Sequence, residues 1–261
     1  MFDFHVHSAA SYDASFHPQL MADAAAKAGL REICFTDHLD YMRSKPRQET
    51  GYDVAFYNEL HSGVSAPGVT IRHGVEVGLT PWNQAEIRED LQKRHYDFVL
   101  GSVHFVADED PYFAPYWQGK TVEEAELAFF RENLRCVELH EDFDVLGHLT
   151  YIGKTAAHPA RRKVELAPYR DLTAAVFETL IAKGKGIEVN SSGVDVIGDF
   201  LPGAEFLRLY RDLGGEIVTI GSDAHTPERV GQYADRALAM LKEIFGHVCT
   251  FANREPIFHK L

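Results

Sequence analysis

The chain has 261 residues, 45% of them hydrophobic and 25% charged, and its formal net charge is -13. This composition is typical of a globular protein with one sizeable core, and we expect a single domain over residues 1–261. The acidic balance excludes nucleic acid as the main partner, and no apolar run reaches the roughly 20 residues of a membrane span, so no membrane partner is expected.

The first predicted element is a strand over residues 2–6, in the stretch FDFHVHS at residues 2–8. Asp3, His5 and His7 alternate there with apolar residues, and residues two apart in an extended chain point to the same side. One face of a core strand would therefore carry three side chains capable of binding a metal. A surface strand with one wet face gives the same pattern, so the rest of the chain has to decide.

Further along, short β-branched or apolar runs alternate with stretches whose apolar residues recur at helical spacing. Strands followed in turn by helices predict a parallel sheet with helices outside it, closed as a barrel; an open doubly wound sheet is the alternative. The predicted strands cover residues 2–6, 31–36, 69–77, 97–103, 143–149, 186–190 and 216–221. The predicted helices cover residues 18–28, 53–63, 82–94, 121–141, 168–183, 203–213 and 226–245.

Polar side chains lie at or just beyond the carboxyl ends of these predicted strands. In a parallel barrel these ends converge on one face, which is where such enzymes keep their chemistry. Their positions therefore favour the barrel over the open sheet and indicate a shared site. They are His7, His38, Glu76, His104, His148, Asn190 and Asp223.

Imidazole and carboxylate ligands suit divalent cations such as zinc, manganese and iron. Two such ions held close together activate a bridging hydroxide for displacement at phosphorus. Other routes to phosphate hydrolysis find no support, because the sequence has no Cys-x5-Arg loop, no phosphate-binding Gly-x4-Gly-Lys-[Ser/Thr] loop and no Gly-x-Ser-x-Gly nucleophile elbow.

Over essentially its whole length the chain resembles the PHP (polymerase and histidinol phosphatase) family, and it is most similar to the branch of monofunctional histidinol-phosphate phosphatases. The resemblance implies an α/β fold, a distorted (β/α)7 barrel with the metal site at the C-terminal ends of its strands. It also implies metal-dependent hydrolysis of L-histidinol phosphate in histidine biosynthesis. The segments that carry it are FTDHLD at 35–40, DFVLGSVHF at 97–105, DVLGHL at 144–149, EVNSSG at 188–193 and TIGSDAH at 219–225.

The resemblance further implies three divalent ions, zinc, manganese or iron, held by nine residues. Glu76 would bridge the first two ions, whose shared hydroxide would attack phosphorus in line, and Asp223 or His225 would pass a proton to the leaving alkoxide. Some family members have histidine where this chain has Asp13. The implied ligands are His5, His7, Glu76 and Asp223 for the first ion, Glu76, His104 and His148 for the second, and Asp13, His38 and His225 for the third.

The expected partner is a small-molecule phosphate monoester. The segment 105–120 after the fourth predicted strand mixes aromatic residues with Asp108, Glu109 and Asp110, which suits a cationic aromatic substrate. An acidic surface loop above packed aromatic residues is the alternative. Arg161, Arg162 and Arg229 are candidates for binding phosphate, and Asn190 and His17 are candidates for contacting substrate, whereas Asp3 and Glu188 are expected to orient metal ligands.

Three other functions remain open on the sequence. The same site could serve a phosphatase of phosphotyrosine or nucleotides, or a phosphodiesterase. An amidohydrolase also begins with His-x-His, but it would need a bridging lysine or another order of ligands. A non-catalytic PHP module is the remaining class, and such modules commonly lose ligands that this chain retains.

The cysteines Cys34, Cys136 and Cys249 are far apart and odd in number, which indicates reduced thiols. The first residues lack the charged and apolar regions of a secretion signal. We therefore expect a cytoplasmic protein, and the sequence leaves its oligomeric state open.

Overall fold

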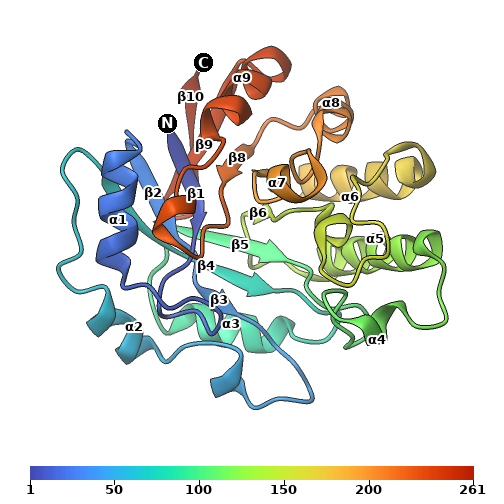
Figure 1. The fold of residues 1–261 in the computed structure, drawn as a ribbon, viewed down its shortest axis with the longest axis horizontal. Coiled ribbons are helices and arrows are strands. Elements are labelled where there is room, and N and C mark those ends of the chain that lie inside the picture. Colours follow the sequence, from blue (N-terminus) through green and yellow to red (C-terminus); the bar gives the residue numbers. More distant parts are fainter.

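The computed structural model describes residues 1–261, apart from the side chain of Arg47. Its seven main strands are all parallel and follow the order β1-β2-β4-β5-β6-β7-β8, and the short β3 pairs with β4 (Figure 1). The strands are β1 (Phe2–Val6), β2 (Glu32–Phe35), β3 (His38–Leu39), β4 (Thr70–Gly78), β5 (Phe98–Ser102), β6 (Val145–Leu146), β7 (Gly186–Asn190) and β8 (Val218–Gly221).

The first strand also contacts the last, because the chain just beyond β8 turns back onto β1. A parallel bridge joins Val6 to Ala224, and the amide of Asp223 donates to the carbonyl of His5 at 2.9 Å. The sheet is therefore a nearly closed barrel of seven strands. This confirms the distorted (β/α)7 barrel and excludes the open doubly wound sheet.

Helices surround the barrel, as the sequence periodicity predicts (Figure 1). The longest, α5, begins with a capping box in which Thr121 and Glu124 each bind the other's backbone amide, at 3.2 and 2.8 Å. The helices are α1 (Pro18–Lys27), α2 (Val54–Leu60), α3 (Gln84–Gln92), α4 (Ala114–Trp117), α5 (Val122–Leu139), α6 (Arg170–Ala182), α7 (Val194–Ile197), α8 (Ala204–Asp212) and α9 (Ala234–Ile244), with 3-10 turns η1 (Arg47–Glu49), η2 (Tyr151–Lys154), η3 (Ala167–Tyr169) and η4 (Pro227–Arg229). None of the helices in the described residues is long and apolar enough to cross a membrane.

Two predicted elements are much shorter than expected, and side chains explain why. Strand β6 ends at Leu146 because the amide of His148 bonds to the carboxylate of Glu188, at 2.8 Å, instead of continuing a strand ladder. Helix α9 begins eight residues later than the predicted start at residue 226. The segment before it includes Gly231, whose φ is +70° and whose amide donates to the buried carboxylate of Asp3.

A C-terminal hairpin that the sequence did not predict consists of β9 (His247–Ala252) and β10 (Glu255–Lys260). Its two-residue turn, Asn253–Arg254, has φ values of +52° and +69° without any glycine, so the usual sequence signal for such a turn is missing. The hairpin lies beside β1 (Figure 1). The ring centroid of its Phe251 lies 4.9 Å from that of Phe98, and the Phe98 ring in turn contacts Phe4. The hairpin therefore completes the core.

We predict that Phe251→Ala lowers the free energy of unfolding by about 3–5 kcal/mol, because it removes a side chain that is 2% exposed and leaves a cavity. Phe258→Ala, in the same hairpin but 50% exposed, is the matched control and should change stability by less than about 0.5 kcal/mol. Urea denaturation measures both values. Equal effects of the two substitutions would contradict this placement of the hairpin.

Candidate metal centre

One buried carboxylate, Glu76 on β4, lies at the centre of the expected ligand set. Its Oε2 is 3.2 Å from Nε2 of His5 and 3.1 Å from Nδ1 of His38, and its Oε1 is 3.3 Å from Nε2 of His104 and 3.0 Å from Nε2 of His148. Imidazoles from four other parts of the barrel therefore meet at this one side chain.

The remaining expected ligands surround this centre. Asp223 Oδ1 lies 3.4 Å from Nε2 of His7 and 3.6 Å from Nε2 of His5. Asp13 Oδ2 lies 3.1 Å from Nε2 of His225 and 3.5 Å from Nε2 of His38. The structure thus brings all nine residues of the expected ligand set into one cluster.

The donor chemistry of this cluster fits divalent cations. The Nε2 atoms of His5 and His7 face each other at 3.0 Å, and ring nitrogens and carboxylate oxygens converge in groups whose atoms lie within 4.8 Å of one another. Imidazole and carboxylate donors are those that zinc, manganese and iron prefer. The groups are His5, His7 and Asp223; His5, Glu76 and His148; His7, Asp13, His38 and His225; and His38, Asp40 and His104.

Asp40 in the last group was not among the expected ligands. One of its oxygens lies 2.9 Å from Nδ1 of His104, and the other accepts the hydroxyl of Tyr12 at 2.7 Å. It therefore orients the His104 ring so that Nε2 faces Glu76. Asp40 directly follows the short β3, a strand that the sequence did not predict, and its distance from residue 104 along the chain hid the contact.

Other imidazoles are oriented in the same way by groups outside the cluster. Nδ1 of His5 lies 2.6 Å from Glu188, and Nδ1 of His7 lies 3.0 Å from the hydroxyl of Ser11, which itself donates to Asp37 at 2.9 Å. Each contact leaves Nε2 facing inward, which is the arrangement that metal-binding histidines usually have. The expectation that Glu188 orients a ligand agrees with this contact.

The charges in the cluster shift the pKa values of its members in opposite directions. Burial lowers the pKa of His7 to about 4, so its ring is neutral and able to bind a metal at pH 7. Burial also acts to lower the pKa of His38, but Glu76, Asp13 and Asp40 together outweigh it and raise that pKa to about 9. Against the cost of burial, the imidazoles of His5 and His38 hold the pKa of Glu76 well below its usual range.

A lysine that the sequence analysis missed lies at the edge of the cluster. Nζ of Lys154, in η2, is 3.0 Å from Oδ2 of Asp223 and 2.6 Å from the hydroxyl of Ser192. Against burial, this ammonium is the main charge that holds the pKa of Asp223 well below its usual range. The only sequence signal was its position six residues after His148.

The residues expected to bind substrate have other contacts in this structure. Arg161 is exposed and reaches the carbonyl of Lys154 at 3.5 Å, and Arg162 lies 3.4 Å from Glu126. The other three residues expected to contact substrate also have protein partners. Arg229 binds Asp195 at 3.3 Å, buried Asn190 donates to Glu188 at 3.1 Å, and His17 accepts the Gln19 amide at the start of α1.

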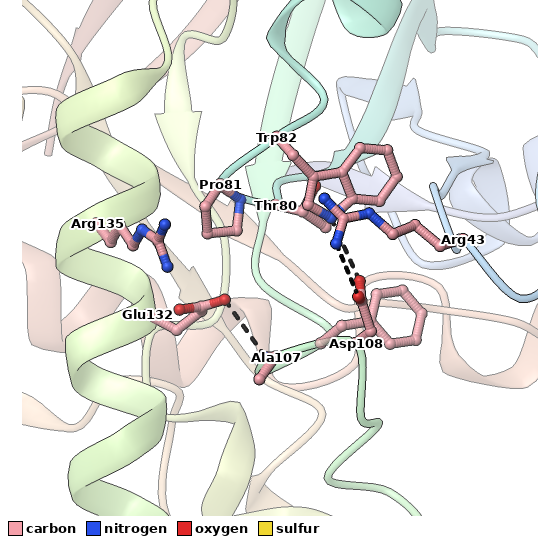
Figure 2. A pocket seen from close by; sticks show the side chains of 9 residues that line it. Arg43, Thr80, Pro81, Trp82, Ala107, Asp108, Glu132 and Arg135 are labelled. Carbon is pink, nitrogen blue, oxygen red and sulfur yellow. Dashed lines mark hydrogen bonds and ion pairs between the residues drawn. The ribbon is translucent and has the colours of Figure 1, made fainter.

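The acidic residues after β5 are not equivalent. Figure 2 shows Asp108 turned toward Arg43, at 3.4 Å, and it also accepts the indole N–H of Trp82 at 3.3 Å. Glu109 pairs with Lys120 at 3.1 Å. Asp110 is partly buried, and its carboxylate accepts the backbone amide of Tyr112 at 2.8 Å. Burial raises its pKa, and the charge of His104 acts against this rise.

Comparisons with known proteins extend over the whole barrel. A family model described as a PHP domain matches residues 3–192. A histidinol-phosphatase of Lactococcus lactis is 26% identical over 96% of this chain and 94% of its own length, and a "Probable histidinol-phosphatase" of Clostridium acetobutylicum is 27% identical over 99% and 96%. The crystal structure of the Lactococcus lactis histidinol phosphate phosphatase, complexed with zinc, L-histidinol and phosphate, matches with a TM-score of 0.86 at 26% identity, covering 98% of both chains.

We predict that zinc binding to the metal-free protein at pH 7 releases protons. His38, with a pKa of about 9, is protonated at that pH and must lose its proton to bind a metal, so apparent affinity should rise with pH up to about 9. Isothermal titration in buffers of different ionisation enthalpy measures the release. A binding heat that is the same in every buffer would contradict the prediction.

Proposed function

This chain belongs to the PHP domain family, and from that premise we propose that it is a metal-dependent phosphatase that hydrolyses L-histidinol phosphate to L-histidinol and phosphate in histidine biosynthesis. The observation that carries this function is the match, over 98% of both chains, to a phosphatase that holds zinc, histidinol and phosphate. The complete cluster around Glu76 supports it, because a non-catalytic module has no need to keep every ligand.

For the metals, we propose three divalent ions, zinc, manganese or iron. The contacts favour one group of ligands on each side of Glu76 and a third group at the rim. When bound, such ions activate water and bind phosphoryl oxygens. The proposed ligands are His5, His7, Glu76 and Asp223; Glu76, His104 and His148; and Asp13, His38 and His225.

Lys154 is the cation that we propose for binding the phosphoryl group, because its ammonium lies at the cluster itself. The two oxygens of Asp223 face different neighbours: Oδ1 faces His5 and His7, whereas Oδ2 faces Lys154. Because its pKa is held low, Asp223 is an ionised carboxylate. We therefore propose that Oδ2 accepts a proton from the attacking water and passes it to the leaving alkoxide. His225, whose Nδ1 lies 2.9 Å from the carbonyl of Asp223, helps to hold that residue in place.

Asp110 is the proposed site for the ammonium group of the substrate. Asp108 and Glu109 already have basic or indole partners, whereas Asp110 lies close enough to His104 for their charges to interact. The exposed aromatic side chains of Tyr112 and Phe113 follow it directly and offer faces for an imidazole ring.

We also propose that residues 1–261 form one domain in the cytoplasm. The C-terminal hairpin packs against Phe98 of the barrel, so the chain after β8 belongs to the same core. The three cysteines are buried and free, which suits a reducing compartment.

The function is tested by phosphate release from histidinol phosphate, tyrosine phosphate, a nucleotide monophosphate and a generic aryl phosphate, with and without added zinc or manganese. We expect kcat/KM for histidinol phosphate to exceed the others by about 100-fold or more. Glu76→Gln, which should leave the circular dichroism spectrum unchanged, serves as the inactive control. Turnover no faster than that of the aryl phosphate would rule out this substrate and leave only the hydrolase class.

Asp110→Asn should raise KM for histidinol phosphate by about tenfold, because it removes a charge-assisted contact with the ammonium group. KM for the aryl phosphate, which has no ammonium group, should stay unchanged. Glu109→Gln, next to it and paired with exposed Lys120, is the matched control. An equal rise in KM for both substrates would contradict the assignment of Asp110.

A further inference from the structure

Glu126 is a carboxylate buried on α5, with 1% of its surface exposed. A buried carboxylate costs several kcal/mol unless hydrogen bonds and opposite charge compensate it. Here the hydroxyl of Tyr169 donates to Oε2 at 2.7 Å, Nε2 of His158 lies 3.3 Å from Oε1, and Arg162 lies 3.4 Å from Oε1. All three donors lie in the connection between β6 and α6, so Glu126 ties this connection to α5.

His158 is buried as well, at 3% exposure, and its hydrogen bonds determine its tautomer. Nδ1 accepts the backbone amides of Ala160 at 3.0 Å and Arg161 at 2.9 Å, so Nδ1 carries no hydrogen. The ring proton therefore resides on Nε2, which donates it to Glu126. The His158 side chain thus stabilises the turn at residues 158–161 and also connects this turn to α5.

The same turn contacts the segment that follows β5. The rings of His158 and Trp117 meet edge to face, with centroids 4.8 Å apart, and the Trp117 indole donates to the carbonyl of Pro111 at 2.7 Å. The amide of Ala157 donates to the carbonyl of Tyr112 at 3.2 Å. Residues 110–117 and 155–162, which we call the two mouth segments, are therefore packed together around His158.

Each mouth segment lies next to a proposed substrate contact: Asp110 begins the first, and Lys154 immediately precedes the second. Resting on the proposed function, we propose that the Glu126–His158 pair is a positioning unit for the reaction. It holds the two mouth segments together. Asp110, which would bind the ammonium group of the substrate, and Lys154, which would bind its phosphate, therefore keep a fixed separation. Neither Glu126 nor His158 touches the metal ligands or the substrate.

A purely structural role explains the pair less well. Apolar residues of the same shape can replace both partners of a buried hydrogen bond with little loss of stability, so the core at α5 does not require a carboxylate. What an apolar residue would not do is fix the path of a long irregular connection, because it offers no directional bonds. Arg162, expected to bind phosphate, contributes to the same unit.

The experiment compares His158→Asn with the wild-type protein, both loaded with zinc. Asparagine can still accept the backbone amides of the turn but is too short to reach Glu126. We expect KM for histidinol phosphate to rise about tenfold with kcat changed less than about threefold, because misplaced contacts weaken binding before they affect the chemistry. Amide hydrogen exchange should speed up in both mouth segments, while zinc content stays the same.

Phe251→Ala, in the hairpin on the other side of the molecule, is the control for lost stability alone and should leave KM and the exchange of both mouth segments unchanged. If His158→Asn does not fold, Tyr169→Phe removes one donor to Glu126 without losing volume and should raise KM about threefold. Exchange in the mouth segments equal to that of the wild type would overturn the proposal. This readout needs no turnover, so it separates failure of the positioning unit from failure of the proposed substrate.

Discussion

The convergence of imidazoles on the buried carboxylate of Glu76 is the constraint on which the rest of this structure depends. Its two oxygens face rings from β1, from β3 and from the chain beyond β5 and β6, at 3.0–3.3 Å. A fully buried carboxylate is costly without partners of opposite charge or bound cations. The parallel barrel supplies those partners, because its strands all deliver their carboxyl ends to the same face.

Around this centre, acidic groups that do not belong to the nine expected ligands fix the orientation of the imidazole rings. Glu188, Asp40 and Asp37 act on His5, on His104 and, through Ser11, on His7. They also add negative charge close to the site and offset part of the charge of bound cations. Lys154 returns a positive charge to this site next to Asp223, where we propose that the phosphoryl group binds.

The connections after β5 and after β6 carry the residues that we propose to contact the substrate. The acidic residues of the segment after β5 have different partners. Asp108 binds Arg43 and Trp82, whereas Asp110 lies near His104. The connection after β6 carries Lys154 and is held by Glu126. Under the proposed function, specificity therefore depends on these two loops, which buried polar contacts hold in place, whereas the strands carry the proposed metal ligands.

The sequence by itself indicated the seven strands and their barrel, because strand periodicity and the position of polar residues at strand ends are local signals. The nine expected metal ligands came from the resemblance of its motifs to the PHP family. The sequence did not reveal the contacts of Lys154 with Asp223, of Asp40 with His104 or of Arg162 with Glu126, nor the C-terminal hairpin. The members of each pair are far apart along the chain, and the sequence does not show which carboxylate an arginine or lysine meets. Only the tertiary structure decides which charges meet, because that depends on how the long connections fold back over the barrel.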